Sequence, residues 1–110
     1  MKEGYLYILT NFNRSTLYIG VTNDIERRVL EHKCGIGSKF TSKYHLTRLL
    51  HYENFGEIVQ AIDREKQLKT WRREWKWNLI IEENPNYLDL AKDWFTEEEI
   101  KEYLWNVGKR

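Results

Sequence analysis

The first half of the chain alternates short apolar and aromatic runs with polar connections. One run covers residues 5–10, a second covers residues 16–21 and a third covers residues 48–53. Runs of this length that are rich in tyrosine, isoleucine, leucine and threonine favour β-strands. The segment 11–15 between the first two supplies asparagine and serine, which form tight turns. The first two strands are therefore expected to pair as an antiparallel hairpin.

Helical spacing begins after the second run. Asn23 stands three residues before Glu26, a variant of the capping box, which predicts a helix that continues to residue 32 or 33. The positions that share one face of this helix, at the i, i+3, i+4, i+7 spacing, are Ile25, Arg28, Val29 and His32. Two apolar side chains and two chemically active ones are thus expected to point toward the sheet and its edge.

Helices are also expected in most of the second half of the chain. Residues 34–47, which include two glycines, are expected to form a loop with one helical turn. A long helix is predicted over 57–81, and the Asn-Pro pair at 84–85 ends it, because the residue before a proline is pushed out of the α region. The Thr-x-x-Glu capping box at 96–99 opens a last helix.

Together these elements predict an α/β fold of the α+β type. Its order is β-β-α-β-α followed by a C-terminal helix, with a small three-stranded antiparallel or mixed sheet flanked by helices. A chain of 110 residues with 41% hydrophobic side chains suits one compact domain. We expect this domain to cover residues 1–90, and residues 91–110 to form a helical extension packed on it.

The charge balance argues against a protein that binds nucleic acid through net charge alone. Lys and Arg number 18 against 17 Asp and Glu, which gives a net charge of +1. The basic residues are concentrated over 27–76 and the acidic ones over 82–102. A local basic surface beside an acidic tail would explain this distribution, and two solvated faces of opposite sign would explain it equally well.

Cysteine content and hydropathy indicate in which cellular compartment the protein is expected. Cys34 is the only cysteine, which excludes an internal disulfide and a cysteine-based zinc site. The first residues lack the apolar region of a signal peptide, and no apolar stretch approaches the roughly 20 residues that cross a bilayer. We therefore expect a soluble, cytoplasmic protein in a reducing environment, with no membrane contact.

Two tyrosine-bearing triplets and the helix behind them contain the candidate chemistry. Tyr7 ends Tyr-Leu-Tyr in the first strand, and Tyr18 opens Tyr-Ile-Gly in the second strand eleven positions later. Arg28 follows Tyr18 by ten positions and precedes His32 by one helical turn. With both triplets at this separation, the run from residue 4 to residue 32 resembles the beginning of a GIY-YIG nuclease domain. The resemblance extends to about residue 90 and is strongest to small stand-alone members of that family.

The resemblance implies catalytic roles for four of these side chains. Tyr7 and Tyr18 match the catalytic tyrosine pair of the family, of which either one could act on or orient the nucleophilic water. Arg28 would stabilise the transition state, because a guanidinium stays protonated and can bind two phosphate oxygens. His32 would serve as a general base or hydrogen-bond the phosphate. The ordinary alternatives are packed strand tyrosines, an exposed helix arginine and a surface histidine.

Glu65 places a carboxylate close to the apolar stripe of the predicted long helix. A buried carboxylate needs partners. Lys69 at i+4 and Arg72 at i+7 would supply them through an ion pair on the helix face. The resemblance implies instead that Glu65 is catalytic and is the family's metal ligand, here for Mg²⁺ or Mn²⁺.

The sequence departs from the family pattern in two places. Val21 follows Tyr-Ile-Gly where some relatives carry a basic residue, so that phosphate contact would be missing. The family asparagine that follows the glutamate could be Asn78 or Asn84. We favour Asn84, because Asn-Pro ends the helix near the expected place. Gly20 and Asn84 are accordingly predicted to be supporting residues.

Contacts to DNA are expected from basic residues interleaved with aromatic ones. Trp71 and Trp75 lie at i, i+4 and are expected to pack, which leaves Trp77 as the better candidate for exposure and base stacking. Arg64 and Lys66 belong to the same basic cluster. The residues predicted to bind nucleic acid are Lys39, Lys43, Lys69, Arg72, Arg73, Lys76 and Trp77.

The resulting hypothesis is a divalent-metal-dependent endonuclease that hydrolyses DNA phosphodiester bonds. No second domain is expected that would recognise a long sequence. Selectivity is therefore expected for a DNA structure such as a branch, flap or single strand, or from a protein partner, and the chain is expected to be a monomer or a weak dimer. Two other classes fit the sequence: a nucleic-acid-binding module with the same fold that does not cut, and, less well, a protein-interaction domain.

Overall fold

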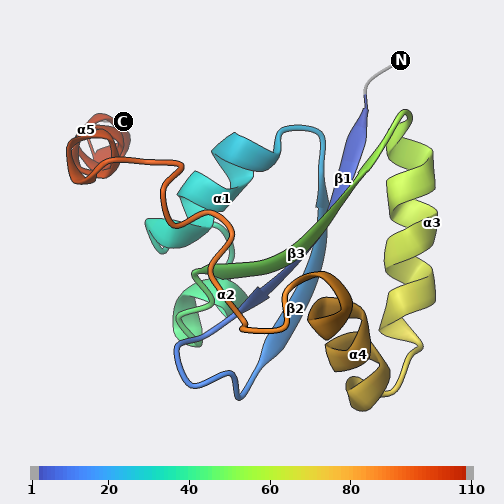
Figure 1. Ribbon diagram of the computed structural model, residues 1–110. Coiled ribbons are helices and arrows are strands. Elements are labelled where there is room, and N and C mark those ends of the chain that lie inside the picture. Colours follow the sequence, from blue (N-terminus) through green and yellow to red (C-terminus); the bar gives the residue numbers. More distant parts are fainter. Residues whose placement is uncertain (1–2, 109–110) are drawn as a thin grey trace.

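A three-stranded antiparallel sheet forms the centre of the structure, a computed structural model that describes residues 3–108 (Figure 1). Its strands are β1 (Gly4–Thr10), β2 (Leu17–Thr22) and β3 (Arg48–Phe55), in the order β2-β1-β3. Because β1 is central, its side chains are buried on both faces, and residues 6–10 are all inaccessible. The predicted sheet is confirmed, with the second and third strands ending slightly later than expected.

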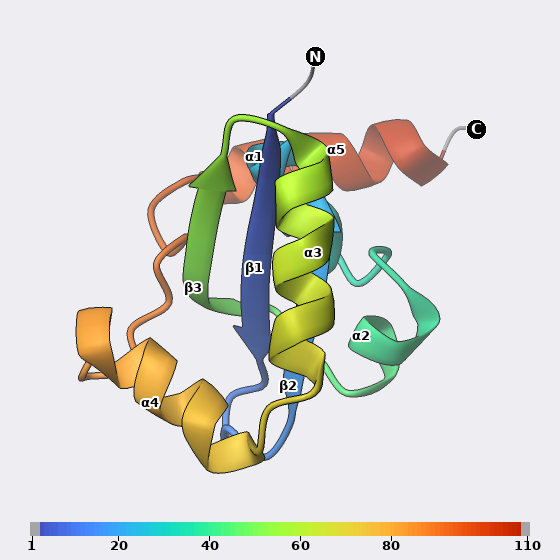
Figure 2. The same cartoon turned by 90° about the vertical axis from the view of Figure 1, so that its right-hand side faces the viewer.

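Helices cover both faces of the sheet (Figures 1 and 2). On one face lie α1 (Ile25–Lys33) and the short α2 (Lys39–Lys43), and on the other lie α3 (Ile58–Lys69) and α4 (Arg73–Glu83). The last helix, α5 (Glu97–Gly108), lies beyond α1 and has no buried residue among those described. None of the helices within residues 3–108 is long and apolar enough to span a membrane.

Alternation along β1 divides the core into two layers. Tyr7 and Leu9 pack with Val29 of α1 on one face, whereas Leu6 and Ile8 pack with residues of α3 and α4 on the other. Each fully buried aliphatic side chain stabilises the fold by about 1.5–3 kcal/mol relative to exposure. The two helix layers therefore depend on the same central strand.

The segment after α4 returns across the sheet to the α1 face (Figure 1). Asp89 anchors it by accepting hydrogen bonds from the backbone N–H groups of Leu49 (3.0 Å) and Ala91 (3.0 Å). Its other carboxylate oxygen lies 2.6 Å from Nζ of Lys33, a half-buried ion pair. Ala91 is fully buried, and Trp94 packs against the same core layer.

The N-terminal cap of α1 lies one residue later than predicted. Asp24, and not Asn23, has the extended backbone of a cap, and its carboxylate accepts a hydrogen bond from the N–H of Arg27 at 3.2 Å. Thr22 holds Asp24 in place by accepting its N–H at 3.1 Å. The capping box predicted at the last helix is confirmed, with Thr96 and Glu99 each accepting the other's N–H.

The single long helix predicted over 57–81 was wrong. The chain breaks after Lys69, where the hydroxyl of Thr70 donates to the carbonyl of Gln67 at 2.7 Å, and a separate helix starts at Arg73. Leu68 before the break and Ile80 after it are both fully buried in the same core layer. A straight helix would carry one of them away from the sheet. The prediction that the helical region ends before Asn84-Pro85 was correct, because α4 ends at Glu83.

A partly buried ionic network joins β3 to α3. Glu53 accepts hydrogen bonds from Arg64 Nε (2.9 Å) and Arg64 Nη2 (3.2 Å), and lies 2.8 Å from Nε2 of the buried His51. Burial disfavours the Glu53 carboxylate, but these bonds outweigh it and lower the pKa of Glu53 to about 2. Arg64, which the sequence placed in the DNA-binding cluster, is thus engaged in the fold.

Replacing Glu53 with Gln should lower the free energy of unfolding by about 2–3 kcal/mol at neutral pH. The folded-state pKa is about 2 against 4.5 for the ordinary group, so this stabilisation is complete above pH 4.5 and is lost as the pH falls toward 2. Urea unfolding of both proteins at several pH values measures it, with the exposed Glu82→Gln as the matched control. A difference that is the same at pH 7 and pH 3 would contradict this origin.

Candidate active site

Tyr7 lies where the central strand meets an opening in the edge strand. Its register partner on β2 is Gly20, and its phenol ring extends over that glycine. A Cβ at Gly20 would lie 2.5 Å from both Cζ and Oη of Tyr7. Only glycine leaves this space, so the predicted supporting role of Gly20 has a steric basis: it lets the Tyr7 hydroxyl reach the edge of the sheet.

Helix α1 brings two polar side chains to that hydroxyl. Arg28 donates from Nε to Tyr7 Oη at 3.3 Å, and His32 Nε2 lies 2.9 Å from the same oxygen. Ile25 and Val29, on the same helix face, are buried against the sheet and fix the helix there. The predicted shared face of α1 is confirmed, and it places an arginine, a tyrosine and a histidine in one hydrogen-bonded chain.

His32 is buried, at 1% exposure, and is held from its other side by α2. Its Nδ1 lies 3.0 Å from Oγ1 of Thr41, and Thr41 in turn donates to the carbonyl of Ser38 at 3.3 Å. A Cβ at Gly37 would lie 2.1 Å from His32 Nδ1, so the backbone closes directly over the imidazole. The surface-histidine alternative is excluded.

Sequence reasoning missed Thr41 as a functional residue. Ser38 accepts the N–H of Thr41 at 3.1 Å as the N-cap of α2, and this cap directs the Thr41 hydroxyl inward. The Ser-x-x-Thr spacing of a capped helical turn was the available signal. Its contact with His32 depends on tertiary packing.

One imidazole tautomer satisfies all of these contacts. If Nδ1–H of His32 donates to Thr41 Oγ1, then Nε2 is an acceptor for the Tyr7 hydroxyl, which itself accepts from Arg28. Every donor in this series of hydrogen bonds, from Arg28 to Thr41, then has an acceptor. The Tyr7 hydroxyl proton accordingly points at His32.

Electrostatics keep both members of this pair neutral. Burial raises the pKa of Tyr7 to about 12, although the hydrogen bond from Arg28 opposes the shift. Burial, with the nearby Arg28 cation, lowers the pKa of His32 to about 4. At neutral pH the site therefore contains a phenol, an unprotonated imidazole and a guanidinium.

Tyr18 and Glu65 complete the surroundings of Tyr7. The ring of Tyr18 lies 6.2 Å from that of Tyr7 and 5.8 Å from that of His32. Glu65 lies on α3, which packs over β1 and β2 from the opposite face, and it is close enough for its charge to contribute to the raised pKa of Tyr7. Tyr7, Tyr18, Arg28 and His32 thus lie together at one edge of the sheet, and the charge of Glu65 acts on Tyr7 from α3.

Comparison with known proteins identifies the family of this chain. The sequence model described as the GIY-YIG catalytic domain matches residues 3–78. The chain belongs to the GIY-YIG family. That family comprises nucleases, which supports a nuclease-type function in general.

Relatives of similar length confirm the prediction of a small GIY-YIG protein. A UPF0213 protein of Haloquadratum walsbyi is 41% identical over 71% of this chain and 86% of its own length. A UPF0213 protein of Staphylococcus saprophyticus is 35% identical over 74% of this chain and 99% of its own. The solution NMR structure of a UPF0213 protein from Bacillus halodurans is 29% identical, with a TM-score of 0.52 over 86% of this chain and 99% of that one.

The GIY-YIG family implies a divalent metal, and Glu65 fits that requirement. Its carboxylate is 23% exposed, and its ion-pair partner is the more exposed Lys69 at 3.4 Å. Arg72, which the sequence also offered as an ion-pair partner for Glu65, lies beyond the end of α3. Within residues 3–108 no cluster of three or more His, Cys, Asp or Glu is suited to a metal. A single accessible carboxylate suits Mg²⁺, which keeps several waters and binds substrate phosphates.

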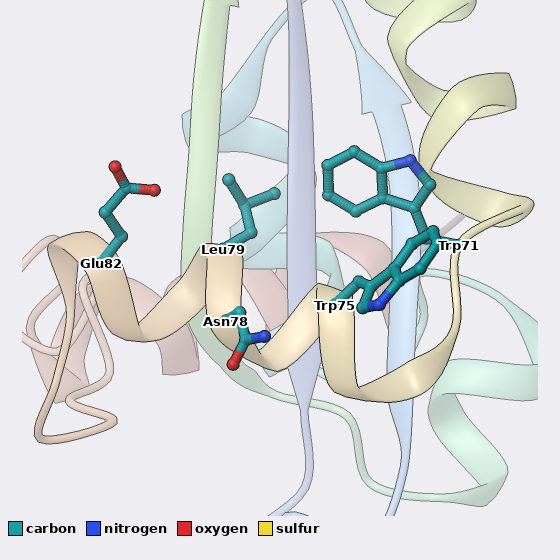
Figure 3. A pocket seen from close by; sticks show the side chains of 5 residues that line it. All are labelled: Trp71, Trp75, Asn78, Leu79 and Glu82. Atoms are coloured by element: carbon teal, nitrogen blue, oxygen red, sulfur yellow. The ribbon is translucent and has the colours of Figure 1, made fainter.

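Of the two candidate family asparagines, Asn84 is built into the fold. It is buried, donates to the carbonyls of Leu50 (3.2 Å) and Leu88 (2.8 Å), and accepts the N–H of Leu88. These bonds tie the end of α4 to β3. Asn78 is exposed and lines a hollow of about 410 Å³ beside Trp71 and Trp75 (Figure 3).

Some of the predicted DNA-binding residues of this GIY-YIG domain make contacts within the fold, and others are open to solvent. Trp77 was expected to be the exposed tryptophan, which was wrong: it is half-buried, with its ring 5.4 Å from that of Tyr87, whereas Trp75 is 46% exposed. Arg73 donates to the carbonyls of the β1–β2 loop. Arg73 is nevertheless exposed, as are Lys39, Lys43, Lys69 and Arg72, whereas Lys76 is half-buried.

Substituting Gly20 by Ala should destabilise the domain by about 1–3 kcal/mol and displace Tyr7, because the added methyl overlaps the phenol. Gly56→Ala is the matched control, since a Cβ there meets nothing within 4 Å. Chemical unfolding of the three proteins measures the difference. Equal stability of the two variants would show that Tyr7 does not lie over Gly20.

The His32 imidazole should remain neutral, with its proton on Nδ1, between pH 8 and pH 5.5, because its pKa is lowered to about 4. Nitrogen-15 NMR of the ring reports both tautomer and titration. Arg28→Ala should raise the pKa by removing the neighbouring cation, whereas Arg27→Ala, an exposed arginine on the same helix, should not. Titration of wild-type His32 near 6.5 would be inconsistent with this burial.

Proposed function

We propose that the protein is a divalent-metal-dependent endonuclease that hydrolyses phosphodiester bonds in DNA. The observation that supports this most directly is the hydrogen-bonded chain from Arg28 through Tyr7 to His32, at a sheet edge that Glu65 also approaches. Phosphodiester hydrolysis needs an oriented water, a route for its proton and positive charge at the phosphorus oxygens. The protein can supply all three requirements from these side chains and from a metal ion that Glu65 would hold.

Arg28 is suited to bind the scissile phosphate. Its Nε is used by Tyr7, and its Nη1 donates to Glu31 at 3.0 Å, which holds the guanidinium in place. Nη2 has no hydrogen-bond partner among residues 3–108 and the group is partly exposed. Positively charged donors on a fixed fork stabilise the negative charge that builds in the transition state.

Tyr7 and His32 provide the path for the proton of the attacking water. The water oxygen forms a bond to phosphorus while its proton passes to Tyr7 Oη, and the Tyr7 hydroxyl proton passes to His32 Nε2. The bond from phosphorus to the leaving sugar oxygen breaks, and that oxygen takes a proton from solvent. Burial and, to a smaller extent, the Arg28 cation lower the pKa of His32, so a bound phosphate that offsets the Arg28 charge makes the imidazole a better base.

Tyr18 is assigned a different role. No hydrogen bond from its hydroxyl to Arg28 or His32 is present in the described part of the chain, and its ring packs against Tyr7 and His32. It would position those two groups. Mg²⁺ or Mn²⁺ held by Glu65 would supply additional positive charge at the phosphate.

We further propose that the protein acts in the cytoplasm on a DNA structure rather than on a long sequence. The described residues form one small domain, which offers little surface for reading many base pairs. Lys39, Lys43, Lys69 and Arg72 supply exposed positive charge for phosphate contacts. A protein partner would be a second source of specificity.

Purified protein should cut DNA in Mg²⁺ or Mn²⁺ and not in EDTA, and both Glu65→Ala and Arg28→Ala should reduce the rate at least 100-fold, as removal of a transition-state donor does. Labelled duplex, single-stranded and branched DNA are the substrates. Asp63→Ala and Arg27→Ala, exposed residues of the same charge on the same two helices, serve as matched controls.

The outcomes separate the three classes of function. Cutting that persists in both site variants would indicate a contaminating nuclease. DNA binding that weakens with salt, without cleavage in the presence of either metal ion, would favour the nucleic-acid-binding module that does not cut. Neither cutting nor binding would leave the protein-interaction domain as the remaining class.

A further inference from the structure

Aromatic rings extend from the candidate active site to the surface through α2. The ring of Phe40 lies 6.1 Å from that of Tyr18, and the ring of Tyr44 lies 4.9 Å from that of Phe40. Tyr7 is buried, with 1% of its surface exposed, whereas Phe40 and Tyr44 are 46% and 40% exposed. One end of the series is therefore in contact with His32 and the other is open to solvent.

Core packing does not account for the outer two rings. Thr41 is the buried residue of α2, and it contacts His32. Phe40 and Tyr44 lie at i, i+4 on that helical turn and belong to neither core layer. The fold thus uses α2 to hold the histidine, and in doing so presents two aromatic side chains beside the site.

The segment that carries these rings has basic but no acidic side chains. Between Glu31 and Glu53 the sequence contains no aspartate or glutamate, while Lys39 and Lys43 on α2 are exposed. Nζ of Lys43 lies 5.2 Å from the centre of the Tyr44 ring. A ligand for this surface must combine a flat apolar group with negative charge.

We propose that Phe40 and Tyr44 form a stacking platform for an unpaired nucleobase of the DNA strand whose phosphate lies at Arg28, with Lys39 and Lys43 on the adjoining phosphates. This inference rests on the proposed nuclease function and specifies its substrate class. Bases within a duplex already stack on their neighbours and pair across the helix, so their faces are not accessible without being flipped out. The platform therefore selects a single strand, flap or unpaired junction.

Binding to the full chain in EDTA tests the platform without requiring cleavage. The probes are a fluorescein-labelled single strand of mixed sequence and the blunt duplex of the same sequence, followed by anisotropy. Stacking on one aromatic ring contributes about 1–3 kcal/mol. Phe40→Ala and Tyr44→Ala should therefore each weaken single-strand binding roughly tenfold and change duplex binding less than twofold.

Matched variants distinguish stacking from structural damage. Phe40→Leu keeps apolar volume against Tyr18 but removes the ring and should lose single-strand affinity, whereas Tyr44→Phe keeps the ring and should retain it. Trp75→Ala removes another half-exposed aromatic, which has Arg72 over its ring at 5.5 Å, and should have no effect. Thermal unfolding of each variant confirms that it is folded.

Several results would overturn the platform. These are unchanged single-strand binding in Phe40→Leu and Tyr44→Ala, equal weakening toward single strand and duplex, or a loss in Trp75→Ala in place of the α2 variants. Cleavage of blunt duplex at the same rate as single strand would also reject it while leaving the nuclease function intact. Absence of all cleavage would reject the nuclease function, and the binding measurements would still decide whether the rings hold a base.

Discussion

The close approach of the Tyr7 phenol to the backbone of Gly20 is the constraint on which the site depends. Because a side chain at that position would occupy the space of the phenol, the edge strand must lack one there. The hydroxyl then reaches a position where Arg28 and His32 of α1 can both contact it. A shift of β2 by one residue would place Val21 or Ile19 beside the ring and close the opening.

Stability and chemistry share the same elements in this fold. His32 is as buried as the aliphatic core, and its two ring nitrogens are both occupied, one by a strand tyrosine and one by a threonine of α2. Burial keeps the imidazole unprotonated, which is the form that can accept a proton. Ser38 and Thr41, which order α2, therefore also fix the hydrogen bond at Nδ1 of the histidine.

Two sheet faces contribute separately to the site. Arginine and histidine come from α1, whereas Glu65 comes from α3, which packs on the opposite face. They can meet only at an open edge of the sheet, and β2 is that edge. The ionic network of Glu53 with Arg64 holds α3 against β3, so the position of the Glu65 carboxylate depends on the contacts of the residue next to it on the same helix.

Local patterns predicted a large part of this structure. The strand runs, the face shared by Ile25, Arg28, Val29 and His32, and the Thr96–Glu99 cap all depend on residues close in sequence, where spacing fixes geometry. The break between α3 and α4 was missed because apolar spacing continues through it, and only the need to bury both Leu68 and Ile80 reveals it. The exposure of Trp75 rather than Trp77 follows from the same break.

The sequence by itself determined the element types, the family and the identity of the residues around Tyr7, because triplet spacing and helix periodicity are properties of neighbouring positions. Tertiary structure decided what those residues do to one another. The burial of His32, its contact with Thr41 and the steric need for Gly20 arise between segments that are distant along the chain. Such contacts depend on how the two helix layers pack on one strand, which no local pattern encodes.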